Sequence, residues 1–202
     1  MRPGWWALLL VAVVSGTACT HAPLGTPSSH ALAALPAQVE LSQVPFYPQE
    51  EDQCGPAALA MLLTHAGVPR TPEQMRDEVY LPLRHGSVPI EMVSAVRRAG
   101  LTPQVVDGGI AQLLQVVSQG RPVIVLLNLR WSVWPQWHYA VVVGFDRTRE
   151  EILLHSGLQV RQVISLQDFD RQWASAQRWG LLIRPPRRPS VSDGQARPPP
   201  TG

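Results

Sequence analysis

Cys54 lies where a polar stretch gives way to an apolar one, a position that suits a nucleophile. Residues 49–53 read Gln-Glu-Glu-Asp-Gln, and residues 55–63 read Gly-Pro-Ala-Ala-Leu-Ala-Met-Leu-Leu. The second stretch predicts a helix, because proline fits a first turn and the following residues are strong helix formers. Unpaired N–H groups and the dipole at a helix start stabilise a thiolate, so we expect the pKa of Cys54 to lie below that of a free cysteine. The alternative is a buried structural cysteine.

A cysteine nucleophile needs a base within hydrogen-bond reach, and His138 is the best candidate. It stands near the start of the very apolar stretch Trp137–Phe145, which places a titratable ring at the rim of the core. The alternative for His138 is a core histidine bonded to a carbonyl. His65, at the far end of the Cys54 helix, and His85, in a polar loop, are weaker candidates.

The reaction also needs a donor for the oxyanion that forms on the attacked carbonyl. Gln49 carries a neutral side-chain amide a few residues before the cysteine. Gln53 is a rival donor by proximity, and a solvated loop residue is the alternative for Gln49.

The elements that would position these residues follow an order of helices first and strands later. Helices are expected from Cys54 to His65, from Thr71 to about Tyr80, and over Pro89–Ala99, Ile110–Ser118 and Ser165–Ala174. Strands are expected over Thr102–Val106, Pro122–Leu129, Trp137–Phe145, Glu151–His155, Val160–Ile164 and Trp179–Arg184. This order predicts an α+β fold with a helical lobe packed on a mostly antiparallel sheet.

The two ends of the chain differ in composition from this domain, which is expected to span 39–184. Residues 1–19 read as an export signal, with Arg2 before a short apolar run. Residues 20–38 are rich in Pro, Ser, Ala, Gly and Thr and read as a flexible tether. Residues 185–202 are rich in Pro and Arg and read as a disordered tail.

The signal ends in Ser-Gly-Thr-Ala-Cys, which resembles the lipobox of bacterial lipoproteins. The resemblance implies lipidation of Cys19 and a membrane anchor on the periplasmic side, and Thr20 in place of Asp implies the outer membrane. The alternative is ordinary cleavage near Ala18, which would leave a soluble periplasmic protein. A disulfide between Cys19 and Cys54 is less favoured, because lipidation accounts for Cys19.

The composition narrows the classes of ligand. The formal net charge of the 202 residues is +2 and only 16% are charged, with no basic face of the kind that binds nucleic acid. The two cysteines and the histidines lack zinc-site spacing. We therefore expect no nucleic acid, no metal ion and no cofactor.

Several motifs together resemble family thirty-nine of the cysteine peptidases, the bacteriocin-processing group that cleaves double-glycine leaders. They are Val-Pro-Phe-Tyr at 44–47 followed by Gln49, Cys-Gly-Pro-Ala at 54–57, Gly-Arg-Pro-Val-Ile at 120–124, His-Tyr-Ala-Val-Val at 138–142 and Gly-Phe-Asp at 144–146. The resemblance covers about residues 41 to 184. It implies a papain-like fold, Cys54 as nucleophile, His138 as general base and acid, and Gln49 as an oxyanion-hole donor with the Cys54 backbone N–H.

The chain departs from that family at the third catalytic position. The resemblance implies an Asp on the strand after the histidine strand, where this chain reads Leu-Leu-His-Ser-Gly at 153–157. His155 or Ser156 is therefore expected to orient His138. Neither adds an anion to stabilise an imidazolium.

The resulting hypothesis is an exported cysteine peptidase that acts through a Cys54 thioester on a peptide or protein substrate in the cell envelope. One alternative is a non-catalytic peptide-binding module on the same fold. Another is an acyl transferase that uses the same thioester. Trp131, Trp134 and Trp137, ahead of His138, suit a groove wall, core packing or a membrane-surface contact.

Overall fold

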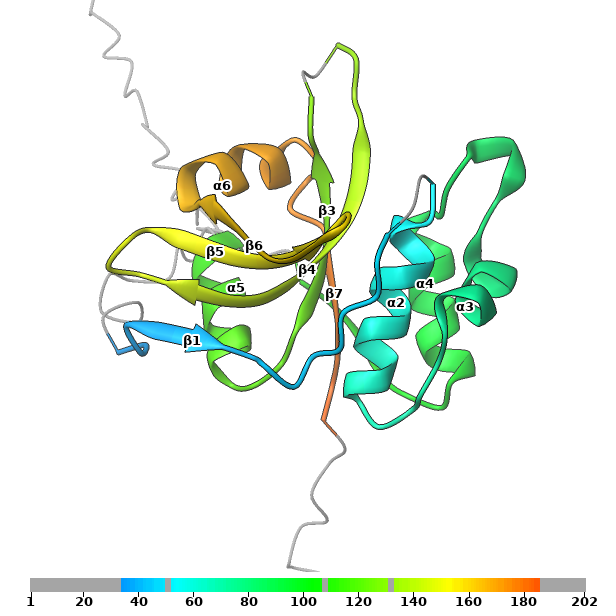
Figure 1. Cartoon of the computed structure of the whole chain (residues 1–202), viewed down its shortest axis with the longest axis horizontal. Coiled ribbons are helices and arrows are strands. Elements are labelled where there is room, and N and C mark those ends of the chain that lie inside the picture. The colour runs from blue at the N-terminus through cyan, green and yellow to red at the C-terminus, as the bar shows by residue number, and fades with distance from the viewer. Residues whose placement is uncertain (1–33, 50–51, 107–108, 131–132, 186–202) are drawn as a thin grey trace, which may run out of the picture.

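The structure is a computed structural model, and it describes residues 34–49, 52–106, 109–130 and 133–185. The predicted export signal, the lipidation site and the tail after Pro185 lie outside the described residues. Within these ranges, helices and strands separate into a helical lobe and a sheet lobe, as Figure 1 shows.

The helical lobe is built around α2 (Cys54–His65), and it also contains α3 (Pro72–Val79), the 3-10 turn η1 (Pro82–Arg84) and α4 (Pro89–Arg98). Residues 55–63 of α2 are all buried, because the sheet covers one side of the helix and α3 and α4 cover others. The helix α3 begins with a capping box, in which Thr71 and Gln74 each bond the other's backbone N–H. Because residues 55–63 are buried, the start of α2 lies inside the protein.

The sheet lobe is antiparallel at every strand pairing. Its strands are β1 (Gln38–Glu40), β2 (Pro103–Val106), β3 (Val123–Asn128), β4 (Trp137–Asp146), β5 (Glu151–Ser156), β6 (Gln159–Ser165) and β7 (Gly180–Ile183). The order is β2-β7-β3-β4-β5-β6, with β1 paired to the far end of β4. The helices α5 (Gly109–Ser118) and α6 (Leu166–Ala174) pack on this lobe.

Alternate residues of β4 face two different cores, as strand geometry requires. Tyr139, Val141 and Val143 pack with α2 in one cluster, whereas Ala140 and Val142 pack with α5 and α6 in the other. The predicted α+β fold, with a helical lobe on a mostly antiparallel sheet, is confirmed.

The described fold includes residues before Val39, the predicted start of the domain. β1 starts at Gln38 and pairs with the last residues of β4, after the part of β4 that pairs with β3. Leu35 packs against the cluster that contains α5 and α6. Arg147 bonds the carbonyl oxygens of both Leu35 and Ala37. Gly144 permits the close approach of β1, since a Cβ there would lie 2.4 Å from the Val39 oxygen. The last residues of the predicted tether therefore belong to the fold.

Candidate active site

Cys54 is the first residue of α2 and lies against the first residues of β4. The backbone amides of Tyr139, Gly55 and Cys54 itself act on its sulfur. Tyr139 follows His138 in the chain, so the fold brings the predicted nucleophile and the predicted base to the same place. Glycine is required at position 55, because a Cβ there would lie 2.5 Å from the Ser87 hydroxyl oxygen and 3.5 Å from the Tyr139 ring.

The pKa of the Cys54 thiol is raised, and the expectation of a lowered pKa is wrong. Burial raises it, since water that would solvate a thiolate is excluded. The three backbone amides lower it, as expected at a helix start, but they do not outweigh burial, and the negative charge of Asp52 raises it further. The thiol is therefore protonated at neutral pH before a substrate binds.

His138, the second residue of β4, is partly buried, and burial lowers its pKa. Its Nε2 lies 3.0 Å from the hydroxyl oxygen of Ser156 on β5. This contact leaves Nδ1 as the nitrogen that can face Cys54. A neutral thiol beside a neutral imidazole is the resting pair that the two pKa shifts favour.

Of the two candidates for orienting His138, Ser156 makes the contact and His155 is engaged elsewhere. His155 is 6% exposed. Its Nδ1 accepts a hydrogen bond from the Arg161 N–H at 3.2 Å, so its Nε2 carries the proton and donates to the Val44 carbonyl at 3.3 Å. His155 thus ties the segment before Gln49 to the β5–β6 hairpin.

Gln49 is buried, with 5% of its surface exposed, which excludes the solvated-loop alternative. Its Oε1 accepts a hydrogen bond from the Gly157 N–H at 2.8 Å, and its backbone N–H donates to the Gly157 carbonyl at 2.9 Å. Its Nε2 is buried without a hydrogen-bond partner among the described residues. Such an unpaired donor is costly unless something binds it, so it is available to a developing oxyanion.

Three consecutive residues at the end of β5 and the start of the following turn hold the parts of the site together. His155 bonds the Val44 carbonyl and Ser156 contacts His138. Gly157 bonds both the side-chain oxygen and the backbone N–H of Gln49. Sequence reasoning missed the role of Gly157. The available sequence signal was that this residue is a glycine directly after His155 and Ser156. Its backbone has a positive φ of +57°, which glycine adopts readily.

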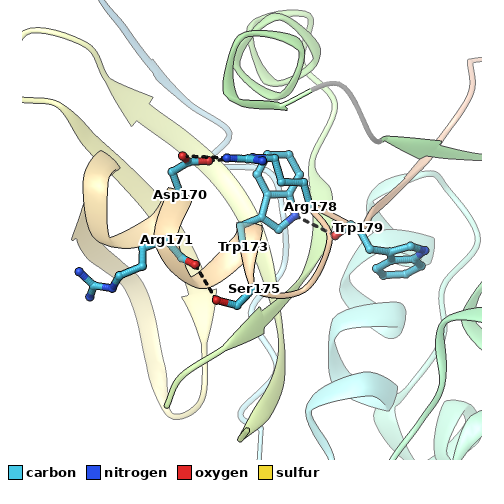
Figure 2. Close-up of polar contacts among 6 residues, drawn as sticks. All are labelled: Asp170, Arg171, Trp173, Ser175, Arg178 and Trp179. Carbon is cyan, nitrogen blue, oxygen red and sulfur yellow. Dashed lines mark hydrogen bonds and ion pairs between the residues drawn. The ribbon is translucent and has the colours of Figure 1, made fainter. Parts of the chain in front are cut away.

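Tyr139 packs against Trp179 in the turn after α6, and Figure 2 shows the polar contacts that hold this turn. Arg178 makes two bonds with the Asp170 carboxylate at 3.0 and 3.1 Å, and Trp173 Nε1 donates to the Trp179 carbonyl at 2.8 Å. The Trp179 ring then meets the Tyr139 ring edge-on, with centroids 5.9 Å apart. Tyr139 in turn donates its hydroxyl to the Ser87 carbonyl at 3.4 Å.

His65 and His85, also among the described residues, make their contacts elsewhere. His65 Nε2 is at the opposite end of α2, 3.3 Å from the Gly120 carbonyl oxygen. His85 pairs with Asp52 at 3.6 Å, at the exposed rim near the start of α2. Within the described ranges, no cluster of three or more His, Cys, Asp or Glu side chains is placed to hold a metal ion.

Two of the three tryptophans ahead of His138 are exposed, which excludes core packing for them. Trp134 is 77% exposed and Trp137 is 51% exposed. Trp131 lies outside the described residues. None of the helices in the described part of the chain is long and apolar enough to span a bilayer.

The amino-acid sequence matches a known protein family. Residues 41–180 match the Peptidase_C39 like family. The chain belongs to this family. The resemblance inferred from the sequence motifs is thereby confirmed, and membership supports a cysteine peptidase. No curated protein sequence matches the chain.

Solved structures show the same fold at low sequence identity. A protein described as a C39-like peptidase from Bacillus anthracis superposes with a TM-score of 0.60 at 18% identity, covering 75% of this chain and 99% of that one. The peptidase domain of Streptococcus ComA, a bifunctional ABC transporter, gives 0.57 at 19% identity, covering 71% and 99%. A double-glycine-motif protease from an AMS/PCAT transporter, in complex with the leader peptide, gives 0.53 at 23% identity, covering 69% and 91%. The predicted papain-like cysteine peptidase fold is confirmed.

Proposed function

We propose that this protein hydrolyses peptide bonds, with Cys54 as nucleophile, His138 as base and acid, Ser156 orienting His138, and Gln49 in the oxyanion hole. The observation that carries the proposal is the buried amide nitrogen of Gln49, which has no partner among the described residues while its oxygen is fixed by Gly157. A buried glutamine with a purely structural role would form hydrogen bonds through both its Oε1 and its Nε2. An oxyanion donor must keep one end for the substrate.

The chemistry starts from the neutral pair. His138 takes the thiol proton as the sulfur attacks the substrate carbonyl carbon, and the resulting oxyanion accepts hydrogen bonds from Gln49 Nε2 and the Cys54 backbone N–H. The imidazolium then gives its proton to the leaving amine, which leaves a thioester on Cys54. Water attacks the thioester after giving a proton to His138, and that proton returns to the sulfur as the acid product departs.

Ser156 acts on His138 from the side of Nε2. Its hydroxyl oxygen accepts the Nε2–H and holds the ring so that Nδ1 can exchange the proton with sulfur. Since a hydroxyl is neutral, it stabilises the imidazolium less than a carboxylate would. Turnover is therefore expected to be slower than with an Asp at this place.

We place the enzyme in the cell envelope, where its substrates would be peptides or proteins. The export signal and the lipobox-like ending at Cys19 support this placement and an anchor on the periplasmic face of a membrane, the outer one. Metabolic labelling with a clickable fatty acid tests it. A Cys19→Ser chain should lose both the label and the membrane fraction, whereas equal labelling would exclude an anchor at this residue.

The central test combines a thiol probe with peptide turnover. A peptidyl electrophile should label the full chain on Cys54 and thereby block peptide cleavage. His138→Ala should abolish both the labelling and the cleavage. His65→Ala, at the opposite end of α2, serves as a matched control. Labelling by the peptidyl electrophile that is unchanged in His138→Ala would exclude the pair.

A non-catalytic peptide-binding module is the second candidate, and the neutral Ser156 hydroxyl beside His138, where the family resemblance implies a carboxylate, favours it. This candidate predicts that Cys54→Ser keeps full biological function and full peptide affinity. The peptidase predicts that the same variant keeps affinity but loses turnover. Product analysis with added amines separates hydrolysis from acyl transfer, the remaining alternative.

A further inference from the structure

Trp137 lies on the face of β4 that is turned toward the helical lobe. Side chains of a strand alternate between faces. Tyr139 packs in the cluster that contains α2, whereas Ala140 packs in the opposite cluster. Trp137, two residues before Tyr139, shares the face of Tyr139, and it pairs with Asn128 at the last rung of the β3–β4 ladder.

This position is next to the nucleophile. The Tyr139 ring would touch a Cβ at Gly55, the residue after Cys54, and its hydroxyl reaches the Ser87 carbonyl. Strand alternation places Trp137 one pleat further along the same face, beyond Tyr139. Trp137 is 51% exposed, whereas Tyr139 is 3% exposed.

The helical lobe carries different side chains near Cys54. Asp52, two residues before the cysteine, pairs with His85 at 3.6 Å, and His85 is two residues before the Ser87 that covers Gly55. Near the start of α2 the helical lobe therefore carries a polar pair, whereas the sheet lobe carries an exposed indole at the start of β4. Residues 133–137 contain no charged side chain.

We infer that Trp137 forms the apolar wall of a substrate subsite and selects peptides with a bulky apolar side chain next to the scissile bond. The inference rests on the proposed function. An exposed aromatic face beside a nucleophile gains most from an apolar occupant, since burying both surfaces removes apolar area from water. Ordering a side chain there also excludes water from the reacting thiol.

The tip of the same hairpin provides a matched control. Trp134 is 77% exposed and precedes the first residue of β4. It therefore belongs to the connection between β3 and β4, the hairpin that projects from the sheet in Figure 1. It is the same residue type, on the same hairpin, without the strand position next to Tyr139. A general effect of exposed tryptophan would appear at both positions, whereas a subsite wall predicts an effect at Trp137 alone.

The test compares peptides that differ at one residue next to the cleaved bond. One series varies the residue before the bond and a second series the residue after it, each with Leu, Phe, Ala or Glu. The full native chain should cleave the Leu and Phe peptides with the higher kcat/KM. Trp137→Ala should reduce that preference about tenfold or more, the effect expected when an apolar contact is lost. Trp137→Phe should retain most of it, and Trp134→Ala all of it. Cys54 alkylation by iodoacetamide, which needs no subsite, should be unchanged in Trp137→Ala and reports that the variant is folded.

A selectivity that Trp137→Ala leaves within twofold of the native chain overturns the inference while the peptidase stands. If the native chain cleaves no peptide, the same peptides are measured by fluorescence anisotropy on Cys54→Ser protein. Tighter binding of Leu and Phe peptides that is lost in Cys54→Ser/Trp137→Ala supports the subsite even though the proposed turnover has failed. Equal binding of all peptides, or no binding, overturns it.

Discussion

The hydroxyl oxygen of Ser156 lies 3.0 Å from Nε2 of His138, at the place where the family resemblance led us to expect a carboxylate. The geometry of an orienting group is kept while its charge is lost. In a related Ser-His-Asp triad, replacing the Asp by its amide costs about four orders of magnitude in kcat, partly through the wrong tautomer. A serine can accept the Nε2–H, so this chain keeps the tautomer and loses only the anion.

Ser156→Asp should therefore raise activity. A carboxylate oxygen facing Nε2 would raise the pKa of His138, which burial now lowers, and would stabilise the imidazolium that forms during attack. We expect kcat to increase by about tenfold or more, and Ser156→Ala to lower it. Ser175→Ala, which removes only a bond to the Arg171 carbonyl at the end of α6, is the control. Lower activity in Ser156→Asp with an intact fold would mean that Ser156 does not act on His138.

The pH dependence of Cys54 alkylation should be that of a buried thiol. Burial raises the pKa of Cys54 and lowers that of His138, so both shifts disfavour a thiolate–imidazolium pair at neutral pH. The rate with iodoacetamide should therefore still be rising at about pH 9, above the ordinary pKa of a cysteine. A plateau that begins below pH 6, as a preformed ion pair gives, would contradict this expectation.

The free energy of unfolding should fall on acidification through the ordinary pKa of histidine. Burial lowers the pKa of His155 from 6.5 in the folded state, although its bond to Val44 opposes the shift. Below that pH the unfolded chain binds a proton that the folded chain does not, so stability decreases as pH falls. Urea unfolding between pH 8 and 5 should show this slope. His155→Gln should reduce it, and burial of His138, which lowers the pKa of that residue too, should leave part of the slope. An identical slope in His155→Gln would contradict the assignment.

The sequence predicted the fold because each element carries a local signal, and it named the residues from which the proposed site is built. The apolar run after Cys54 and the β-branched run before Gly144 indicate a helix and a strand, and the motifs around Cys54 and His138 carry the family resemblance. Burial could not be predicted locally. Cys54 has the amides of a helix start, yet the packing of β4 against α2 decides the direction of its pKa shift. The choice between His155 and Ser156 likewise depended on strand register and on Arg161, a residue from the next strand.

Gln49→Ala should lower kcat with little change in peptide affinity. Its Nε2 is expected to bond only the oxyanion, so the loss falls on the transition state. Removing one such donor typically costs about 100- to 1,000-fold in kcat. Gln53→Ala removes the rival amide, whose residue serves as the N-cap of α2 without a side-chain capping bond. A larger loss in Gln53→Ala than in Gln49→Ala would reverse the assignment.

Gly55→Ala should destabilise the site through a single steric contact with Ser87. The added Cβ would lie 2.5 Å from the Ser87 hydroxyl oxygen and 2.7 Å from its Cβ, closer than packed atoms approach. The loop that carries Ser87 is held by Tyr139, so we expect overpacking to cost about 1–3 kcal/mol. Ser87→Gly removes both clashing atoms, together with a buried hydroxyl that has no partner among the described residues. The double variant should therefore recover most of the lost stability and the alkylation rate of Cys54. A double-mutant cycle by urea unfolding measures the coupling, and additive losses would show that the strain at Gly55→Ala arises elsewhere.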